Sequence, residues 1–250
     1  MQAVGLSDKG IIRRNNQDTV YSSVEPIGML PDLFIVADGM GGQPAGDYCS
    51  HMLVASILEE VKKSTEKEPV RIVRSAIENV NRKLYRESVS NAELSGMGST
   101  LVAAMIDEDT LYTFNVGDSR LYIISDHAHQ ITKDHSFVEE MADAGRMQRG
   151  SLDYNRNKNI ITRAIGTDMR VDIDVFEYSL EKNDRVLLCT DGLTNMLPDE
   201  EISRIVLGAP DISKAAETLI REANNKGGKD NISVVLVDPS GDRSGREVQS

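Results

Sequence analysis

The order in which helical and strand-like segments follow one another is the feature of this sequence that most restricts its fold. Two helical segments, 45–61 and 73–84, follow the second strand-like run, and two more, beginning near Pro198 and Ile212, precede the last one. Strands are expected at 17–23, 33–37, 99–106, 111–116, 121–124, 173–178, 186–190 and 232–237. This order lacks the β-α-β alternation of a doubly wound parallel sheet. It favours an α+β fold, in which stacked antiparallel sheets carry helix pairs on their outer faces.

A single domain is expected over residues 1–240, because the chain has no internal repeat and no linker in its middle. Ser136 and Glu139 have the spacing of a capping box, so a helix is predicted from there to Gly145. The stretch that follows, 146–158, has little periodicity. The polar residues 241–250 are expected to form a disordered tail.

Composition and charge exclude several classes of protein. The formal net charge of -12 makes nucleic acid a poor partner, because phosphate backbones are repelled. No stretch approaches the roughly 20 apolar residues of a membrane span, so no membrane insertion is expected. The N-terminus has no basic region followed by an apolar run, which predicts a cytoplasmic protein. Cys49 and Cys189 lie in apolar segments and are predicted to be free buried thiols.

A subset of the carboxylates is placed differently from the rest. Four aspartates stand where an apolar strand ends or begins, each with glycine nearby, and a fifth opens a strand: Asp38 in LFIVADG, Asp118 in YTFNVGDS, Asp191 in VLLCTDG, Asp230 in GGKDNISVVLV and Asp18 in RRNNQDTV. A strand fixes the direction of its terminal side chain, and glycine lets the backbone turn sharply or approach an ion. These five side chains are therefore able to converge.

Converging carboxylates repel one another, and burying them without compensation costs several kcal/mol each. A cation would remove that cost. The candidate ligands are all oxygens, with no His or Cys cluster of the kind that indicates zinc, which favours hard ions such as Mg²⁺ or Mn²⁺. An Asp-Gly pair is also a common turn, and the spacing alone leaves the turn and the metal site both open.

The ordered motifs decide between these two interpretations. They are RRNNQD (13–18), VADGMGG (36–42), GSTLV (98–102), NVGDSRLY (115–122), ITKDHS (131–136), ITRAIG (161–166), LLCTDGL (187–193) and GGKDNISVV (227–235). In this order they resemble the motifs of the metal-dependent protein phosphatases of the 2C type, especially the bacterial members. The resemblance covers about residues 1 to 238.

The resemblance implies a central β-sandwich of two antiparallel sheets flanked by helix pairs, with a dinuclear centre of Mn²⁺ or Mg²⁺ at one end. Asp38 matches the carboxylate that bridges both ions, and the carbonyl of Gly39 matches a further ligand. Asp191 and Asp230 match ligands of one ion. Asp18 matches an early acidic residue that contacts the site directly or through water.

A third, weaker ion and a flap subdomain are also implied by the resemblance to the bacterial members. Asp118 and Asp191 match the pair that holds the third ion. The flap corresponds to about 136–166. It carries the basic residues Arg146, Arg149 and Arg156, although the chain as a whole has a net negative charge. We hypothesise that these arginines contact phosphoprotein substrates. The alternative is an ordinary solvated loop.

The implied activity is hydrolysis of phosphoserine and phosphothreonine in proteins by metal-activated water, with no protein nucleophile. The implied partners are phosphorylated proteins, among them a bacterial Ser/Thr kinase and its substrates, and the protein is expected to be a monomer. Arg13 stands five residues before Asp18, as in the family motif, and is expected to hold the phosphate by a bidentate fork.

The sequence departs from the family pattern at one position. Many eukaryotic relatives have a His, often assigned as the general acid, directly after the Asp-Gly of the second motif, and Met40 stands there in this chain. Protonation of the leaving group must then come from another group, which the sequence does not identify. His135 is the best remaining imidazole, and a structural hydrogen-bonding role is expected for it.

Other phosphatase chemistries do not fit the sequence. Neither cysteine is followed six positions later by arginine, which excludes a cysteine-dependent phosphatase. Asp172 and Asp174 do not match an aspartyl-phosphate enzyme, because no apolar strand leads into them and Phe176 replaces the expected Thr or Val. A pseudophosphatase, which keeps the fold as a binding module without turnover, would typically have lost metal aspartates. All of them are present, which favours the enzyme.

Overall fold

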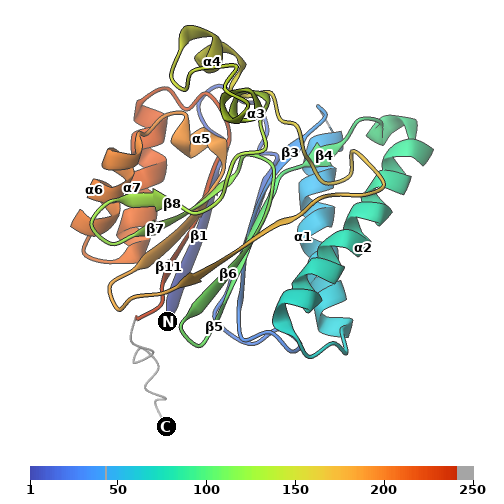
Figure 1. Ribbon diagram of the computed structural model, residues 1–250, viewed down its shortest axis with the longest axis horizontal. Coiled ribbons are helices and arrows are strands. Elements are labelled where there is room, and N and C mark those ends of the chain that lie inside the picture. Colours follow the sequence, from blue (N-terminus) through green and yellow to red (C-terminus); the bar gives the residue numbers. More distant parts are fainter. Residues whose placement is uncertain (43, 241–250) are drawn as a thin grey trace.

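The strands form two antiparallel sheets that face each other (Figure 1). The computed structural model describes residues 1–42 and 44–240, so the expected disordered tail lies outside the described residues. One sheet has the order β1 (Gln2–Asp8), β11 (Ile232–Asp238), β10 (Arg185–Cys189), β7 (Arg120–Ile124) and β8 (Ala128–Gln130). The other has the order β2 (Asp18–Ser23), β3 (Leu33–Met40), β5 (Leu101–Asp107), β6 (Thr110–Val116) and β9 (Asp174–Ser179), and the short β4 (Gly98–Ser99) pairs with β3.

Helices cover the outer face of each sheet, which confirms the predicted layering (Figure 1). The helices α1 (Ala45–Lys63) and α2 (Pro69–Ser90) pack on the second sheet, and a 3₁₀ turn (Ala92–Leu94) follows them. The helices α5 (Asp191–Thr194), α6 (Asp199–Gly208) and α7 (Ile212–Asn225) pack on the first sheet. Two short helices, α3 (Phe137–Asp143) and α4 (Leu152–Asn157), lie above one end of the sandwich.

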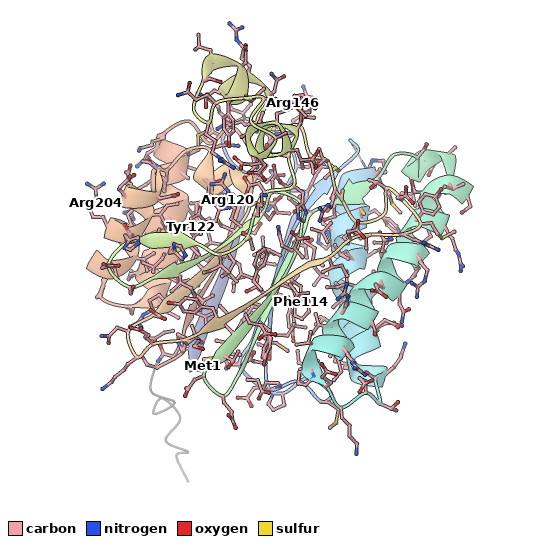
Figure 2. The ribbon with its side chains drawn as sticks, in the orientation of Figure 1. Met1, Phe114, Arg120, Tyr122, Arg146 and Arg204 are labelled. Carbon is pink, nitrogen blue, oxygen red and sulfur yellow. The ribbon has the colours of Figure 1, made fainter. Side chains whose placement is uncertain are left out.

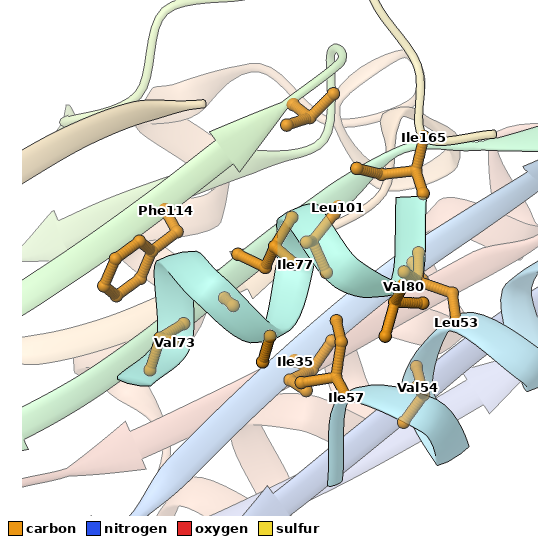
Figure 3. Packing of buried hydrophobic residues seen from close by; sticks show 14 of the residues in the cluster. Ile35, Leu53, Val54, Ile57, Val73, Ile77, Val80, Leu101, Phe114 and Ile165 are labelled. Carbon is orange, nitrogen blue, oxygen red and sulfur yellow. The ribbon is translucent and has the colours of Figure 1, made fainter. Parts of the chain in front are cut away.

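Alternation along each strand assigns side chains to one of three apolar layers. In β3, Phe34 and Val36 point between the two sheets, whereas Ile35 and Ala37 point outward to α1 and α2. Both faces of the strand are therefore apolar, which explains its unbroken LFIVA run. Figure 3 shows the layer beneath α1 and α2, in which Ile35, Leu101 and Phe114 meet the helix residues Leu53, Ile57, Val73, Ile77 and Val80. Burying each large apolar side chain contributes about 1.5–3 kcal/mol.

The structure differs from the sequence prediction in a few local elements. The edge strand β1 was not predicted, and the short helix α4 occupies part of the aperiodic stretch 146–158. The helix expected from Ser136 is present. The Ser136 half of the predicted capping box is formed, because the Ser136 hydroxyl oxygen accepts a hydrogen bond from the Glu139 N–H at 3.4 Å. The Glu139 carboxylate accepts from Arg149 instead of completing the box. Gly145 follows with a φ of 67°, in the left-handed region that ends many helices.

The structure also bears on the predicted free thiols and on the predicted absence of membrane spans. Cys49 and Cys189 are both buried and form no disulfide. Within residues 1–42 and 44–240, no helix combines the length and the apolarity that crossing a bilayer would require.

Candidate metal centre

Asp18 and Asp38 face each other across the β2–β3 pair, because the strand register makes them direct partners. The glycine after Asp38 is required by close backbone packing. A Cβ on Gly39 would lie 2.1 Å from the Gly46 carbonyl oxygen and 2.7 Å from the Gln17 carbonyl oxygen. The Asp-Gly pair of β3 is thus part of a tightly packed strand end, and it brings two carboxylates from one sheet to one end of the sandwich.

Asp191 and Asp230 come to the same end from the other sheet. Asp191 is the first residue of α5, directly after β10, and Asp230 precedes β11. Gly192 allows these two segments to meet, since a Cβ on it would lie 1.8 Å from the Asn231 carbonyl oxygen. The Asn231 side chain also accepts a hydrogen bond from the Gln17 N–H at 2.9 Å, which ties this segment to the residue before Asp18.

Thr100 links Asp38 to the turn that carries Asp118. The Thr100 N–H donates to the Asp38 carbonyl oxygen at 2.8 Å, and the Thr100 hydroxyl lies 2.7 Å from that of Ser119. Gly117 has a φ of 110° and packs so closely on Thr100 that a Cβ would come within 2.7 Å of it. Asp118 is therefore held in a fixed turn, and its side chain is 6% exposed.

His135 supports the same turn. Its Nδ1 accepts a hydrogen bond from the Gly117 N–H at 3.0 Å, and its Nε2 lies 3.1 Å from the Asp174 carboxylate. Burial lowers the pKa of this imidazole, which favours the neutral ring that such an arrangement requires. The predicted structural role of His135 is confirmed.

Within residues 1–42 and 44–240, two buried carboxylate oxygens of the cluster have no hydrogen-bond donor. The Oδ2 atom of Asp18 accepts from the Thr190 and Ser233 hydroxyls at 3.0 and 2.7 Å, but its Oδ1 atom has no partner among these residues. Asp191 accepts from the Asn195 side chain through Oδ2 at 2.9 Å, and its Oδ1 atom also has no partner in the described part of the chain. Buried polar atoms are normally hydrogen-bonded, so oxygens left in this way fit a site that a cation completes.

The electrostatics of the cluster point in the same direction. Burial, together with the charges of Asp191 and Asp230, raises the pKa of Asp18 to about 7, although hydrogen bonds from two hydroxyls act in the opposite direction. Burial and the neighbouring Asp191 raise the pKa of Asp118 to about 8. The pKa of Asp38 is raised well above its ordinary value, first by burial and then by the charges of the other four aspartates. All five carboxylates thus interact electrostatically. A divalent cation would offset both the cost of burying their charges and the repulsion between them.

The candidate ligands are hard oxygen atoms, the donors that Mg²⁺ and Mn²⁺ prefer. Among residues 1–42 and 44–240, no three His, Cys, Asp or Glu side chains have the mutual spacing of ligands to one common ion. Mg²⁺ in particular is usually held by one or two carboxylates and keeps several waters.

The segment 136–166 contributes one wall of a cavity beside Asp118 and Asp191. This cavity has a volume of about 60 Å³, and its lining includes Lys158 and Tyr154. Burial and the charge of Asp230 raise the pKa of Asp191 to about 6, and the charge of Lys158 offsets part of this rise. Figure 2 shows Arg146 on the α3–α4 segment.

The candidate phosphate-binding residue lies at the rim of the cluster. The half-exposed Arg13 pairs with Asp230 through one guanidinium nitrogen, at 2.7 Å from Oδ2. The flap arginines lie elsewhere. Arg149 pairs with Glu139 and Asp143, at 2.8 and 2.7 Å, whereas Arg146 and Arg156 are exposed.

Sequence reasoning missed the residues that support the carboxylates. Thr190 and Asn231 are sequence neighbours of Asp191 and Asp230, and their position beside those aspartates was a usable signal. Ser233 and Lys158 gave none, because each reaches the cluster only through tertiary contacts.

Comparisons with known proteins agree with this geometry. The family model described as Protein phosphatase 2C matches residues 6–232. The serine/threonine phosphatase stp of Listeria monocytogenes serovar 1/2a is 37% identical over 254 residues, which cover 99% of this chain and 99% of the relative. The crystal structure of the serine/threonine phosphatase Stp1 from Staphylococcus aureus has a TM-score of 0.86 at 33% identity and covers 94% of this chain and 93% of its own. A structure of the catalytic domain of the serine/threonine protein phosphatase PstP in complex with 2 manganese ions has a TM-score of 0.80 at 31% identity, with 94% and 96% covered.

Proposed function

The chain belongs to the protein phosphatase 2C family, and we propose that the aspartates at one end of its β-sandwich hold the divalent ions on which this family of enzymes depends. Like the serine/threonine phosphatases that it resembles, the protein dephosphorylates phosphoserine and phosphothreonine in proteins. The observation that carries the proposal is a pair of buried carboxylate oxygens, on Asp18 and Asp191, that have no hydrogen-bond partner among the residues that the structure describes. They lie within a cluster in which every carboxylate interacts electrostatically with others.

The proposed ligands follow from the positions of the side chains. Asp38 lies opposite Asp18 on one sheet and interacts with Asp191 and Asp230 on the other, which supports the proposal that its carboxylate would hold both ions. The other proposed ligands of the two ions are the Gly39 carbonyl oxygen and the carboxylates of Asp18, Asp191 and Asp230. Mn²⁺ or Mg²⁺ are the proposed occupants, because the donors are hard oxygens and the matching PstP structure carries manganese.

A third ion is proposed between Asp118 and Asp191. Both residues line the same small cavity beneath the flap, and both carboxylates have raised pKa values because of burial. Lys158 lines the same cavity, and its positive charge would favour a weaker affinity at this position than at the main centre.

When bound, the ions supply an activated water and offset the negative charge of the phosphate. The residues of the chain bind and orient the reactants. Arg13 is proposed to hold the phosphate, exchanging its single contact with Asp230 for two parallel hydrogen bonds to phosphate oxygens. Thr190 and Ser233 hold Asp18 in one orientation by donating to the same oxygen. The thioether of Met40 has no proton to donate, so leaving-group protonation is assigned to no side chain.

The proposed cellular role is to oppose a bacterial Ser/Thr kinase, acting in the cytoplasm as a monomer on the kinase and its substrates. The similarity to bacterial serine/threonine phosphatases is the reason for this proposal. Arg146, Arg149 and Arg156 are proposed to contact these substrates from the flap. The exposure of all three supports that contact, although Arg149 would have to share its charge with Glu139 and Asp143.

Hydrolysis of a phosphothreonine peptide tests the proposal. The protein should hydrolyse the peptide with Mn²⁺, lose the activity after chelation and recover it when the ion is restored. Asp38→Ala should lower kcat by about three orders of magnitude, because metal ions contribute several kcal/mol to such reactions. The matched control is Asp126→Ala, an exposed aspartate in the β7–β8 turn at the other end of β7. Turnover that survives chelation would contradict the metal centre, and no turnover under any ion would indicate a pseudophosphatase.

A further inference from the structure

Ile11 and Ile12 form an exposed apolar pair beside the metal centre. Their exposed fractions are 65% and 66%. Single exposed apolar side chains are common on protein surfaces and need no explanation. Among the described residues 1–42 and 44–240, however, these two are the only large apolar residues that are both exposed and adjacent in the chain. We refer to Ile11 and Ile12 as the isoleucine shelf.

The shelf is held in place by the loop that carries Asp230. The N–H groups of Ile11 and Ile12 both donate to the Gly228 carbonyl oxygen, at 2.8 and 3.1 Å. The two loops are packed without room for a side chain. A Cβ on Gly228 would lie 2.7 Å from Ile11 Cγ1, and one on Gly10 would lie 2.2 Å from the Asp230 carbonyl oxygen. The shelf therefore has a fixed position relative to Asp230.

The shelf is continuous with the proposed phosphate site. Arg13 follows Ile12 directly, and its guanidinium pairs with Asp230 at 2.7 Å. An extended peptide advances about 3.3 Å per residue, so Ile11 and Arg13 are separated by no more than about two peptide residues. A substrate whose phosphate is held at Arg13 therefore has nearby side chains within reach of the isoleucine shelf.

We propose that the isoleucine shelf binds an apolar side chain of the phosphoprotein substrate, located within about three residues of the phosphorylated Ser or Thr. The inference rests on the proposed function, because it takes the substrate to be bound at Arg13 and the aspartate cluster. An apolar residue in the substrate would bury surface on an exposed isoleucine, whereas a polar residue gains nothing there. The chain thereby selects among phosphorylated segments by a contact that the catalytic centre itself does not provide.

Three substrates distinguish a loss of this apolar contact from a loss of the hydrolysis reaction itself. Two phosphothreonine peptides differ only in having Leu or Ser at the positions flanking the phosphothreonine, and p-nitrophenyl phosphate has no flanking residue. The double variant Ile11→Ser with Ile12→Ser should lower kcat/KM for the Leu peptide about ten-fold more than for the Ser peptide or the aryl phosphate, the low end of what an apolar contact contributes to specificity. Retained hydrolysis of the aryl phosphate also shows that the variant is folded.

The matched control is Met29→Ser. Met29 is 57% exposed and lies in the β2–β3 connection, at the end of these strands remote from Asp18 and Asp38. The Met29→Ser variant should have the same kcat/KM as the native protein for all three substrates. An equal loss for the Leu and Ser peptides, or no loss for either, would overturn the shelf while leaving the proposed function in place. A native protein that hydrolyses none of the three substrates with Mn²⁺ present would overturn both.

Discussion

The ion-free protein should lose stability as the pH rises from about 5 to about 8. Burial raises the pKa of Asp18 in the folded state from 3.8 to about 7, whereas in the unfolded chain the value is close to 3.9. A raised folded-state pKa means that the folded state binds the proton more tightly. The corresponding stability is complete below the unfolded pKa and is lost as the pH rises through the folded one.

The size of the effect follows from the shift. A change of about three pKa units corresponds to ~4 kcal/mol, of which ~3 kcal/mol falls between pH 5 and pH 8. Asp38 and Asp118 shift in the same direction, also because of burial, and add to the loss. A divalent ion in the cluster would remove it, because the ion stabilises the charged carboxylates.

Two variants separate the metal centre from the rest of the protein. Asp18→Asn keeps an oxygen that accepts from Thr190 and Ser233 but carries no charge. Asp32→Asn is the control, because Asp32 is fully buried, has a pKa also raised to about 7 by burial, and accepts from the Ile106 N–H on the strand β5. The free energy of unfolding of each ion-free variant should therefore fall by ~3 kcal/mol less between pH 5 and pH 8 than that of the ion-free native protein.

Urea unfolding at both pH values, with a chelator and with saturating Mn²⁺, measures these differences. With Mn²⁺, the native protein and Asp18→Asn should lose the same amount of stability between pH 5 and pH 8. The native protein should still lose more stability over this range than Asp32→Asn does. The reasoning is refuted if the ion-free native protein is as stable at pH 8 as at pH 5, or if Mn²⁺ changes the Asp32→Asn difference as much as the Asp18→Asn difference.

Three further predictions concern single side chains. Arg13→Ala should lower kcat/KM for an aryl phosphate about 10- to 100-fold, the contribution of a charged hydrogen bond, and Arg13→Lys should restore only part of it; full recovery with Lys would contradict a bidentate contact. Arg149→Glu should raise KM for phosphothreonine peptides more than KM for the aryl phosphate, and equal effects would argue against substrate contact by the flap. Cys49 and Cys189, whose thiol pKa values burial raises to about 12, should stay unreactive toward a thiol reagent at pH 8 until urea unfolds the protein; rapid labelling of the native protein would show that they are accessible.

The sequence predicts the parts of the fold that rest on local patterns. The unbroken apolar run before Asp38 indicated a strand, and β3 is that strand, with Phe34 and Ile35 in different apolar layers. The Ser136–Glu139 spacing likewise indicated a helix cap that the structure contains. Each of these signals lies within a few consecutive residues, which is why it can be recognised without the fold.

The elements that the sequence did not predict depend on distant partners. The edge strand β1 is half-buried and includes Gly5 and Ser7, and its partner β11 lies at the other end of the chain. The helix α5 is four residues long, too short for any periodicity. Lys158 comes to Asp191 only because the chain folds back over the end of the sandwich. The aspartates themselves were found because strand ends and glycine mark them locally.

A crystal structure of the Mn²⁺-soaked protein, with anomalous scattering recorded at the manganese edge, tests the central claim most directly. The account predicts two strong anomalous peaks between Asp38, Asp191 and Asp230, each within about 2.5 Å of carboxylate oxygen. Asp38→Ala crystals treated in the same way should lose at least one of them. A native crystal with no peak among these three side chains would contradict the claim that the converging carboxylates exist to hold metal ions.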